Sequence, residues 1–159
     1  MGALPAYSVA TAKNRFTELR RTASAGTEIL IRDAKRNQGS VSLVPTWLLD
    51  ELVAKEYALS VEVLDRPGDA LQDSEGKTVG KVRSWSLVIP EVHVHGVGHT
   101  KAEAESSLLK ALVEYASDFF SDPAFYLNPN SGRRHHWGYL RRVLRCEGDE
   151  AQLRALLGL

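Results

Sequence analysis

The sequence has few of the residues that build covalent or metal-held frameworks. Its single cysteine, Cys146, excludes an internal disulfide framework and any zinc site made of several cysteines. We expect Cys146 to be a small, partly buried side chain near a helix end. No apolar run approaches the roughly 20 residues that span a bilayer, and the first residues lack a basic region followed by a hydrophobic stretch. We therefore expect a cytoplasmic protein with no membrane partner.

Catalytic signatures are also missing from the sequence. There is no Gly-rich phosphate loop, no Gly-x-Ser-x-Gly motif and no carboxylate pair with a plausible site. His135 and His136 could be imagined as the acid and base of a nuclease, but adjacent residues diverge in direction on a helix. We therefore predict no catalytic residues and no enzyme.

Three further histidines offer the one arrangement that could bind a metal. His93 and His95 alternate on a predicted strand and point to one face, and His99 lies beyond a glycine turn. Imidazoles in this arrangement could hold zinc or nickel. No cysteine or carboxylate has a convincing ligand spacing, although Glu91 would share the face. We predict no metal and no cofactor, and we keep a metal-dependent hydrolase as a third alternative.

The net charge of zero is an average over unequal parts. Residues 1–40 carry seven Lys or Arg and three Asp or Glu, whereas residues 56–130 carry six and twelve, and residues 131–159 carry six and three. A basic N-terminal part beside an acidic middle fits a protein that meets a polyanion with one part and a basic partner with the other. Random scatter of charge in a small protein is the alternative.

The segment from Tyr7 to Pro45 predicts a short strand, a basic helix and two further strands. β-prone residues begin it, Gly26 ends the helix, and the runs at 27–32 and 40–45 are aliphatic and β-branched. Thr46 can cap a second helix. The buried face predicted for the first helix consists of Ala12, Phe16, Leu19 and Ala23, and that of the second of Leu48, Leu49, Leu52 and Val53.

These residues carry a resemblance to a known family. The stretch YSVATAKNRFTELRRTASAGTEILIRD, followed by GSVSLVPTWLLDEL, is similar to the N-terminal module of the Phd/YefM (prevent-host-death) antitoxins. The resemblance implies a homodimer that binds the operator DNA of its own toxin–antitoxin operon and represses transcription. Lys13 and Arg32 stand where that family has basic residues, although the turn after Arg32 is longer and lacks Gly-Lys-Pro. The predicted DNA-binding residues are Lys13, Arg15, Arg32, Lys35 and Arg36.

The middle of the chain predicts three strands and a long helix. Strands are expected at 57–64, 84–89 and 92–97, with a break at 65–69 and a mobile loop at 71–80. Thr100 and Glu103 have the spacing of a capping box. The helix stripe comprises Leu108, Leu112, Tyr115 and Phe119, and Ser121-Asp122-Pro123 ends it.

This middle part also resembles a known domain. The stretch SWSLVIPEVHVHGVGHTKAEAESSLLKALVEYASDF is similar to the core of HicB-like antitoxin domains. The resemblance implies a small sheet with one helix, used for protein association. Residues 124–134 predict a linker, followed by two short helices, the second capped by Asp149. Such a tail could fold back on the middle part or lie in a groove on a partner.

Together these patterns predict an α+β protein with three parts. Residues 1–56 form a Phd-like dimerisation and DNA-binding module, 57–122 a HicB-like block, and 123–159 a linker and helical tail that could bind the toxin. The implied function is that of an antitoxin of a type II system. It would bind operator DNA and a cognate toxin, which we expect to be a RelE-like or other endoribonuclease. The alternative is an interaction module of the same fold that does not bind DNA, which the zero net charge and the altered turn suggest.

Overall fold

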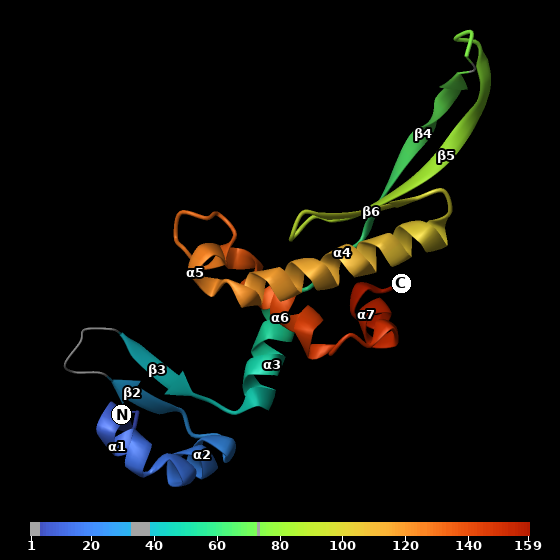
Figure 1. The fold of residues 1–159 in the computed structure, drawn as a ribbon. Helices are drawn as coiled ribbons and strands as arrows, with labels where there is room; N and C mark the ends of the chain where they lie inside the picture. The colour runs from blue at the N-terminus through green and yellow to red at the C-terminus, as the bar shows by residue number, and fades with distance from the viewer. Residues whose placement is uncertain (1–3, 33–38, 73) are drawn as a thin grey trace. The chain divides into compact units, whose positions relative to one another are not determined.

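The fold, seen in a computed structural model, is α+β, as predicted, with two three-stranded sheets. The structure describes residues 4–32, 39–72 and 74–159, and the side chains of these residues except at 65–72 and 78–83. The chain divides into two compact units, Met1–Lys55 (unit 1) and Glu56–Leu159 (unit 2) (Figure 1). Each unit has a sheet and a hydrophobic core of its own.

Unit 1 places two short helices against a small sheet. The strand order is β1-β2-β3, with β1 parallel and β3 antiparallel to β2. Ala12, Leu19, Ala23 and Ile29 form the buried core between helices and sheet. The elements of this unit are β1 (Ala6–Ser8), α1 (Val9–Asn14), α2 (Phe16–Ser24), β2 (Ile29–Arg32), β3 (Ser40–Leu43) and α3 (Thr46–Glu56).

The first predicted helix is interrupted at Arg15. Ser8 caps α1, because its hydroxyl accepts a hydrogen bond from the Thr11 backbone N–H at 3.1 Å. Arg15 then leaves helical geometry, with φ −112° and ψ 17°, and α2 begins at Phe16. The break rotates the second half of the pattern, so Phe16, expected in the core, is 54% exposed. The predictions for Ala12, Leu19 and Ala23 are confirmed.

Helix α3 begins at Thr46, where a helix was expected, but only part of its apolar side is covered. Val53 is buried, and Leu48 and Leu49 are half-buried. The prediction for Leu52 was wrong, since this side chain is 54% exposed within the chain.

Unit 2 is built on an antiparallel sheet of order β4-β5-β6, with helices packed against it. No described helix in either unit combines the length and the apolar character that crossing a membrane requires. The elements of unit 2 are β4 (Glu62–Gln72), β5 (Thr78–Ile89), β6 (Val94–Gly98), α4 (Lys101–Ser121), α5 (Pro123–Tyr126), the 3₁₀ helix η1 (Arg134–His136), α6 (Trp137–Arg145) and α7 (Glu150–Leu157).

Strands β4 and β5 form a longer hairpin than the sequence predicts. The expected break at 65–69 is a register shift between Arg66 and Asp69, after which the pairing with β5 resumes. The expected loop at 71–80 is correspondingly shorter, because β4 runs to Gln72 and β5 begins at Thr78. Pro67 lies within this register shift. A proline is tolerated there because β4 is an outer strand and its hydrogen-bond pairing with β5 is already irregular.

Helix α4 lies very close to β6, and glycine makes this approach possible. A Cβ on Gly96 would overlap the Ala104 carbonyl and the Leu108 backbone, and one on Gly98 would overlap the same turn of α4. The capping box predicted at Thr100 and Glu103 is present, with both reciprocal hydrogen bonds. The capped N-terminus of α4 therefore lies where this helix contacts β6.

The C-terminal helices fold back onto α4 instead of extending away from it. Leu140 and Val143 of α6, and Leu153 and Leu157 of α7, belong to the same core as the α4 stripe. Asp149 caps α7 as predicted, since its Oδ1 accepts hydrogen bonds from two backbone N–H groups. The two alternatives for the tail are therefore decided, for this chain alone, in favour of internal packing.

Two contacts fix α6 against the start of unit 2. Gly138 lies against the ring of Tyr57, where a Cβ would overlap the ring atoms. Arg142 is half-buried and donates a hydrogen bond to the Tyr57 carbonyl at 2.7 Å. Cys146 is the C-cap residue of α6. Its side chain is buried, and burial raises the pKa of its thiol.

Candidate functional site

Arg32, one of the predicted DNA contacts, lies at the end of the central strand of unit 1. It pairs with Ser8 on β1 and with Ser40 on β3, so it stands in the last row of the sheet. Its side chain is exposed. Since Ser8 is also the residue that caps α1, this row lies where the helix begins.

Lys13 lies in the last turn of α1 and is exposed. A helix of six residues is about 9 Å long, so α1 spans only a short distance between its capping residue Ser8 and its last turn. Lys13 and Arg32 thus belong to neighbouring elements joined through Ser8. Lys35 and Arg36, the other predicted contacts in the turn, lie outside the described residues.

Arg15 differs from the other predicted contacts because it is already engaged. Its guanidinium makes a two-pronged ion pair with Glu18, including a hydrogen bond from Nε to Oε2 of 2.9 Å. It also lies 5.5 Å from the centroid of the Tyr7 ring. The hydrogen bond from Arg15 lowers the pKa of the Glu18 carboxyl, so this carboxylate is charged at neutral pH. A phosphate would have to compete with Glu18 for Arg15.

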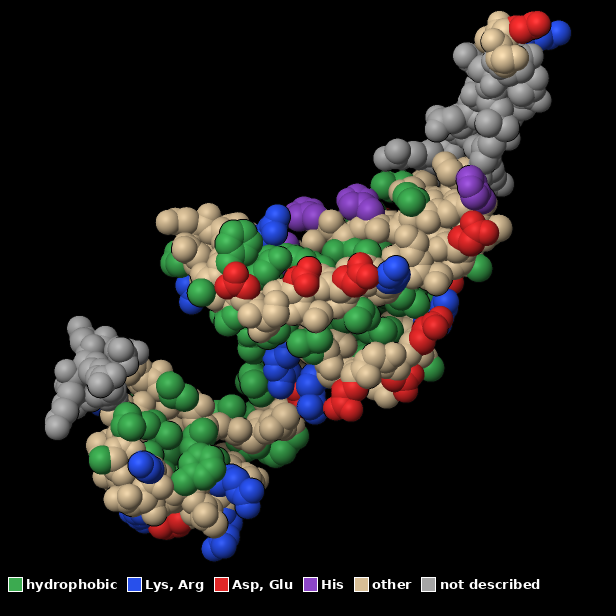
Figure 2. All heavy atoms as spheres, in the orientation of Figure 1, with side chains coloured by type: hydrophobic (Ala, Val, Ile, Leu, Met, Phe, Trp, Pro, Cys, Tyr) green, Lys and Arg blue, Asp and Glu red, His purple; other side chains and the backbone are tan. Residues whose placement is uncertain are grey.

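Several large hydrophobic side chains of unit 1 are exposed to solvent (Figure 2). Val41 on β3 is 64% exposed, although it sits directly opposite Ile31 in the sheet. Together with the exposed Phe16, it shows that the small core covers only part of the apolar surface of this unit. The other exposed members are Leu4, Val9, Trp47 and Leu52. We call these six residues the open apolar surface of unit 1.

Acidic side chains follow one face of α4 in unit 2 (Figure 2). Glu114, Asp118 and Asp122 recur at four-residue spacing and are exposed, which places them on one side of the helix and at its end. Lys110 lies one turn earlier, with its Nζ 4.0 Å from Oε1 of Glu114. We call Glu114, Asp118 and Asp122 the acidic stripe.

The histidines are grouped differently in the structure from the arrangement that the sequence predicts. His95 is on β6, but His93 precedes the strand in a left-handed turn with φ 56°, so the two do not alternate on one strand as expected. Among the residues whose placement is described, no group of three His, Cys, Asp or Glu side chains could hold a metal ion. His93 lies instead near His136, with ring centroids 6.0 Å apart.

Sequence reasoning missed both this histidine grouping and the open apolar surface. The helix break at Arg15 has no proline or glycine to announce it, and the meeting of His93 with His136 joins segments more than forty residues apart. The periodicity of the first helix carried no sign of the break. The charged residues at 13 and 32 were visible only through the family resemblance.

Comparison with known proteins gives two matches. A family model named PHD_like, described as the antitoxin of RelE/RelB toxin–antitoxin systems, matches residues 1–158. A crystal structure from Syntrophomonas wolfei subsp. wolfei, attributed to the antitoxin part of a toxin/antitoxin system, superposes with a TM-score of 0.67. That likeness covers 94% of each chain at 17% identity, and it concerns the fold. No curated protein matches the sequence.

Proposed function

The chain belongs to the PHD-like family of antitoxins, which are not enzymes and act with a cognate toxin, and from this premise we propose a two-part mechanism. Unit 1 pairs with a second copy and binds operator DNA, and unit 2 covers the toxin. The observation that carries the proposal is the family match along residues 1–158. The cytoplasm, where operon DNA and ribosomes are found, is the compartment in which this mechanism would operate.

Self-pairing of unit 1 is supported by its open apolar surface. A domain of about 60 residues is marginally stable alone, because it buries a small share of its surface. Unit 1 spans 55 residues and leaves Phe16 and Val41 more than half exposed. A second copy would remove these side chains from water at roughly 25 cal/mol for each Å² of apolar surface.

DNA binding is assigned to the cations around the last row of the sheet. Lys13 and Arg32 are exposed and lie on elements joined through Ser8, so both can reach one phosphate backbone. Pairing two copies would double this set along one surface. Affinity would come largely from released counterions, with base reading left to Arg32 as the side chain suited to guanine edges. We propose that Lys35 and Arg36, which follow β2 in the sequence, also contact the DNA.

The DNA proposal is tested by gel shift on the DNA upstream of the gene at two salt concentrations. We expect Lys13→Ala plus Arg32→Ala to weaken binding and to reduce the salt slope by about one for each cation removed from each protomer. The control is Lys110→Ala plus Arg134→Ala, which removes the same charge from exposed positions of unit 2. Equal loss in both double variants, or no specific complex with the unchanged protein, would contradict the proposal.

Toxin binding is assigned to unit 2, which we propose to act as a HicB-like block. A toxin that cleaves RNA must present positive charge to its substrate. The acidic stripe on α4 offers carboxylates at helical spacing to such a surface. Charge of opposite sign across an interface would speed association and orient the two proteins.

Co-purification with the product of the adjacent gene tests this assignment. Asp118→Lys should weaken the complex and make a growth-inhibiting toxin active again in co-expressing cells. Asp149→Asn is unsuitable as a control because Asp149 caps α7, so we choose Glu147→Lys, which is exposed and lies between α6 and α7. A toxin complex that is indifferent to Asp118→Lys would remove α4 from the interface, and failure to co-purify at all would oppose the antitoxin mechanism.

A module that associates with proteins but not with DNA is the second candidate. The ion pair between Arg15 and Glu18 favours it, because it occupies one of the predicted DNA contacts. The pair is exposed, and such pairs contribute little to stability, so a phosphate can displace Glu18. The gel shift described above separates the two functions.

A further inference from the structure

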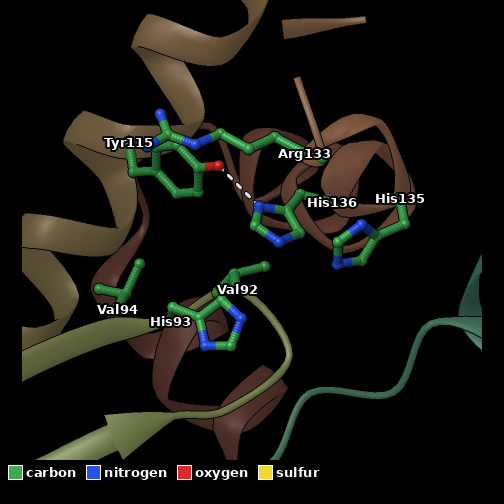
Figure 3. Close-up of a pocket in the computed structure, with 8 residues that line it drawn as sticks. Val92, His93, Val94, Tyr115, Arg133, His135 and His136 are labelled. Atoms are coloured by element: carbon green, nitrogen blue, oxygen red, sulfur yellow. Dashed lines mark hydrogen bonds between the residues drawn. The ribbon is translucent and has the colours of Figure 1, made fainter. Parts of the chain in front are cut away.

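Unit 2 contains a cavity whose polar lining consists of hydrogen-bond donors and imidazoles. The space is about 330 Å³ and lies between the turn before β6, the middle of α4 and the segment leading into η1 (Figure 3). No Asp or Glu is among the described residues that line it. Its ionisable and hydroxyl-bearing side chains are those of His93, Tyr115, Arg133, His135 and His136.

His136 is the buried centre of this lining. Its side chain is 3% exposed, and its Nδ1 lies 2.6 Å from the Tyr115 hydroxyl. The other ring nitrogen, Nε2, is buried and has no hydrogen-bond partner among the described residues. Figure 3 shows that this nitrogen points away from Tyr115, toward the side where His93 lies. A buried polar atom without a partner costs free energy, which a ligand atom could recover.

The protonation of this pair determines what Nε2 can bind. Burial lowers the pKa of His136 to about 4, so the ring is neutral at pH 7, and burial raises the pKa of Tyr115, so the phenol keeps its proton. The Tyr115 O–H can donate to Nδ1, and in that tautomer the single ring proton of His136 is on Nε2. Nε2 is then a neutral N–H donor that needs an acceptor.

The remaining side chains supply charge and shape around that donor. Arg133 lines the cavity, and its Cζ lies 5.9 Å from the Tyr126 ring centroid, a contact that orients the guanidinium. The His135 ring is 4.2 Å and the His93 ring 6.0 Å from His136, centroid to centroid. His135 and His136 therefore do not diverge as expected, because they lie in the 3₁₀ helix η1 and not in an α-helix. His93 holds its place with a positive φ of 56°, a conformation that costs a non-glycine residue free energy.

We propose that this cavity binds a small oxyanion of the phosphate class, held by His136 Nε2–H and Arg133. A lining that contains both a guanidinium and an imidazole N–H donor, with no carboxylate among its described residues, matches the acceptor-only surface of a phosphate. The exposed rings of His93 and His135 lie beside the His136 ring and would complete the lining around the anion. The site is independent of the DNA and toxin surfaces proposed above.

The test is an NMR titration of the full-length protein with inorganic phosphate, adenosine monophosphate and acetate at constant ionic strength. We expect saturable shifts of the His136 ring ¹⁵N and ¹H signals with phosphate and a weaker response to planar acetate. Tighter binding of the nucleotide would identify a phosphate ester as the ligand, whereas equal binding would identify the free ion. Absence of a saturable shift with both phosphates, or a ring proton found on Nδ1 instead of Nε2, would overturn the proposal.

Neighbouring arginines provide a matched pair of variants. Arg133→Gln should weaken phosphate binding about tenfold or more, because it removes a charged hydrogen-bond donor. Arg134→Gln should change binding less than about twofold, since Arg134 is exposed and does not line the cavity. Both positions are at the surface, so both variants should keep the circular dichroism spectrum of the unchanged protein. Equal effects of the two substitutions would contradict a specific site.

Discussion

The two units of this protein differ in how they bury their apolar side chains. Unit 2 covers its sheet with α4 and then covers α4 with α6 and α7, so its buried cluster extends from Leu87 to Leu157. Unit 1 buries Ala12, Leu19, Ala23 and Ile29 but leaves Phe16, Val41 and the rest of its open apolar surface uncovered. Unit 2 thus completes its main core within one copy, although Val63, Val97 and Phe125 remain exposed. In unit 1, by contrast, we propose that a second copy covers the exposed apolar side chains.

The strongest way to break the closed core of unit 2 is to separate α4 from β6. Gly96→Ala would place a methyl group in the backbone of α4, and we expect a loss of about 3 kcal/mol or more of unfolding free energy. Urea denaturation followed by circular dichroism measures it. The matched substitution in unit 1 is Gly26→Ala, where a Cβ would meet nothing within 4 Å and only the positive φ of 103° opposes it. We expect about 1–2 kcal/mol there, and a larger loss for Gly26→Ala than for Gly96→Ala would contradict the close approach.

Acid should destabilise unit 2 through His136. Its pKa is about 4 in the folded chain against 6.5 for an unperturbed histidine, so between these values the unfolded chain binds a proton that the folded chain does not. The stabilising effect of the neutral ring is therefore fully present above about pH 6.5 and falls by about 3 kcal/mol toward pH 4. Urea midpoints measured across this range for the wild type and for His136→Gln isolate the effect. A wild-type slope shared by His136→Gln would contradict the assignment.

Self-association provides the sharpest contrast between the units. Val41 on β3 and Val97 on β6 are exposed to nearly the same extent, 64% and 63%, so they form a matched pair. We expect Val41→Asp to weaken the proposed dimer about tenfold or more, because it places a charge on the open apolar surface. Val97→Asp should leave the proposed dimer intact. Sedimentation equilibrium measures both, and a dimer broken by Val97→Asp alone would move the interface to unit 2.

Removing a helix cap should have a smaller effect. Thr100→Ala deletes the hydroxyl that accepts from the Glu103 backbone N–H, and we expect a loss of about 1 kcal/mol. Thr100→Ser keeps the acceptor and should retain most of the stability. Thermal unfolding followed by far-ultraviolet circular dichroism distinguishes the two variants, and equal melting temperatures would mean that the cap contributes nothing here.

The smallest effect on stability is expected at the exposed ion pair of unit 1. Glu18→Gln should leave the melting temperature within experimental error, because exposed ion pairs contribute little. It should nevertheless raise the affinity for operator DNA by a small factor, since it releases Arg15 and removes a negative charge. Weaker DNA binding in this variant would show that Arg15 does not contact phosphate.

Local signals in the sequence were sufficient where a feature depends on a few adjacent residues. The capping box at Thr100 and the Asp149 cap were predicted because each involves a short stretch and one type of hydrogen bond. The exposure of Phe16 could not be predicted, because it follows from the backbone angles of Arg15. The length of β4 was also missed, since pairing with β5 overrides the turn propensity of Pro67-Gly68. Similarly, the cavity around His136 depends on three segments that only the folded chain brings together.

The irregular course of β4 has a consequence for the behaviour of the protein at high concentration. An outer strand with a free edge can act as a template on which further chains polymerise. Pro67 has no N–H to offer an incoming strand, and the register shift between Arg66 and Asp69 bends the ladder at the same point. The outer edge of β4 therefore offers an interrupted row of hydrogen-bonding groups, which disfavours edge-to-edge association through this strand.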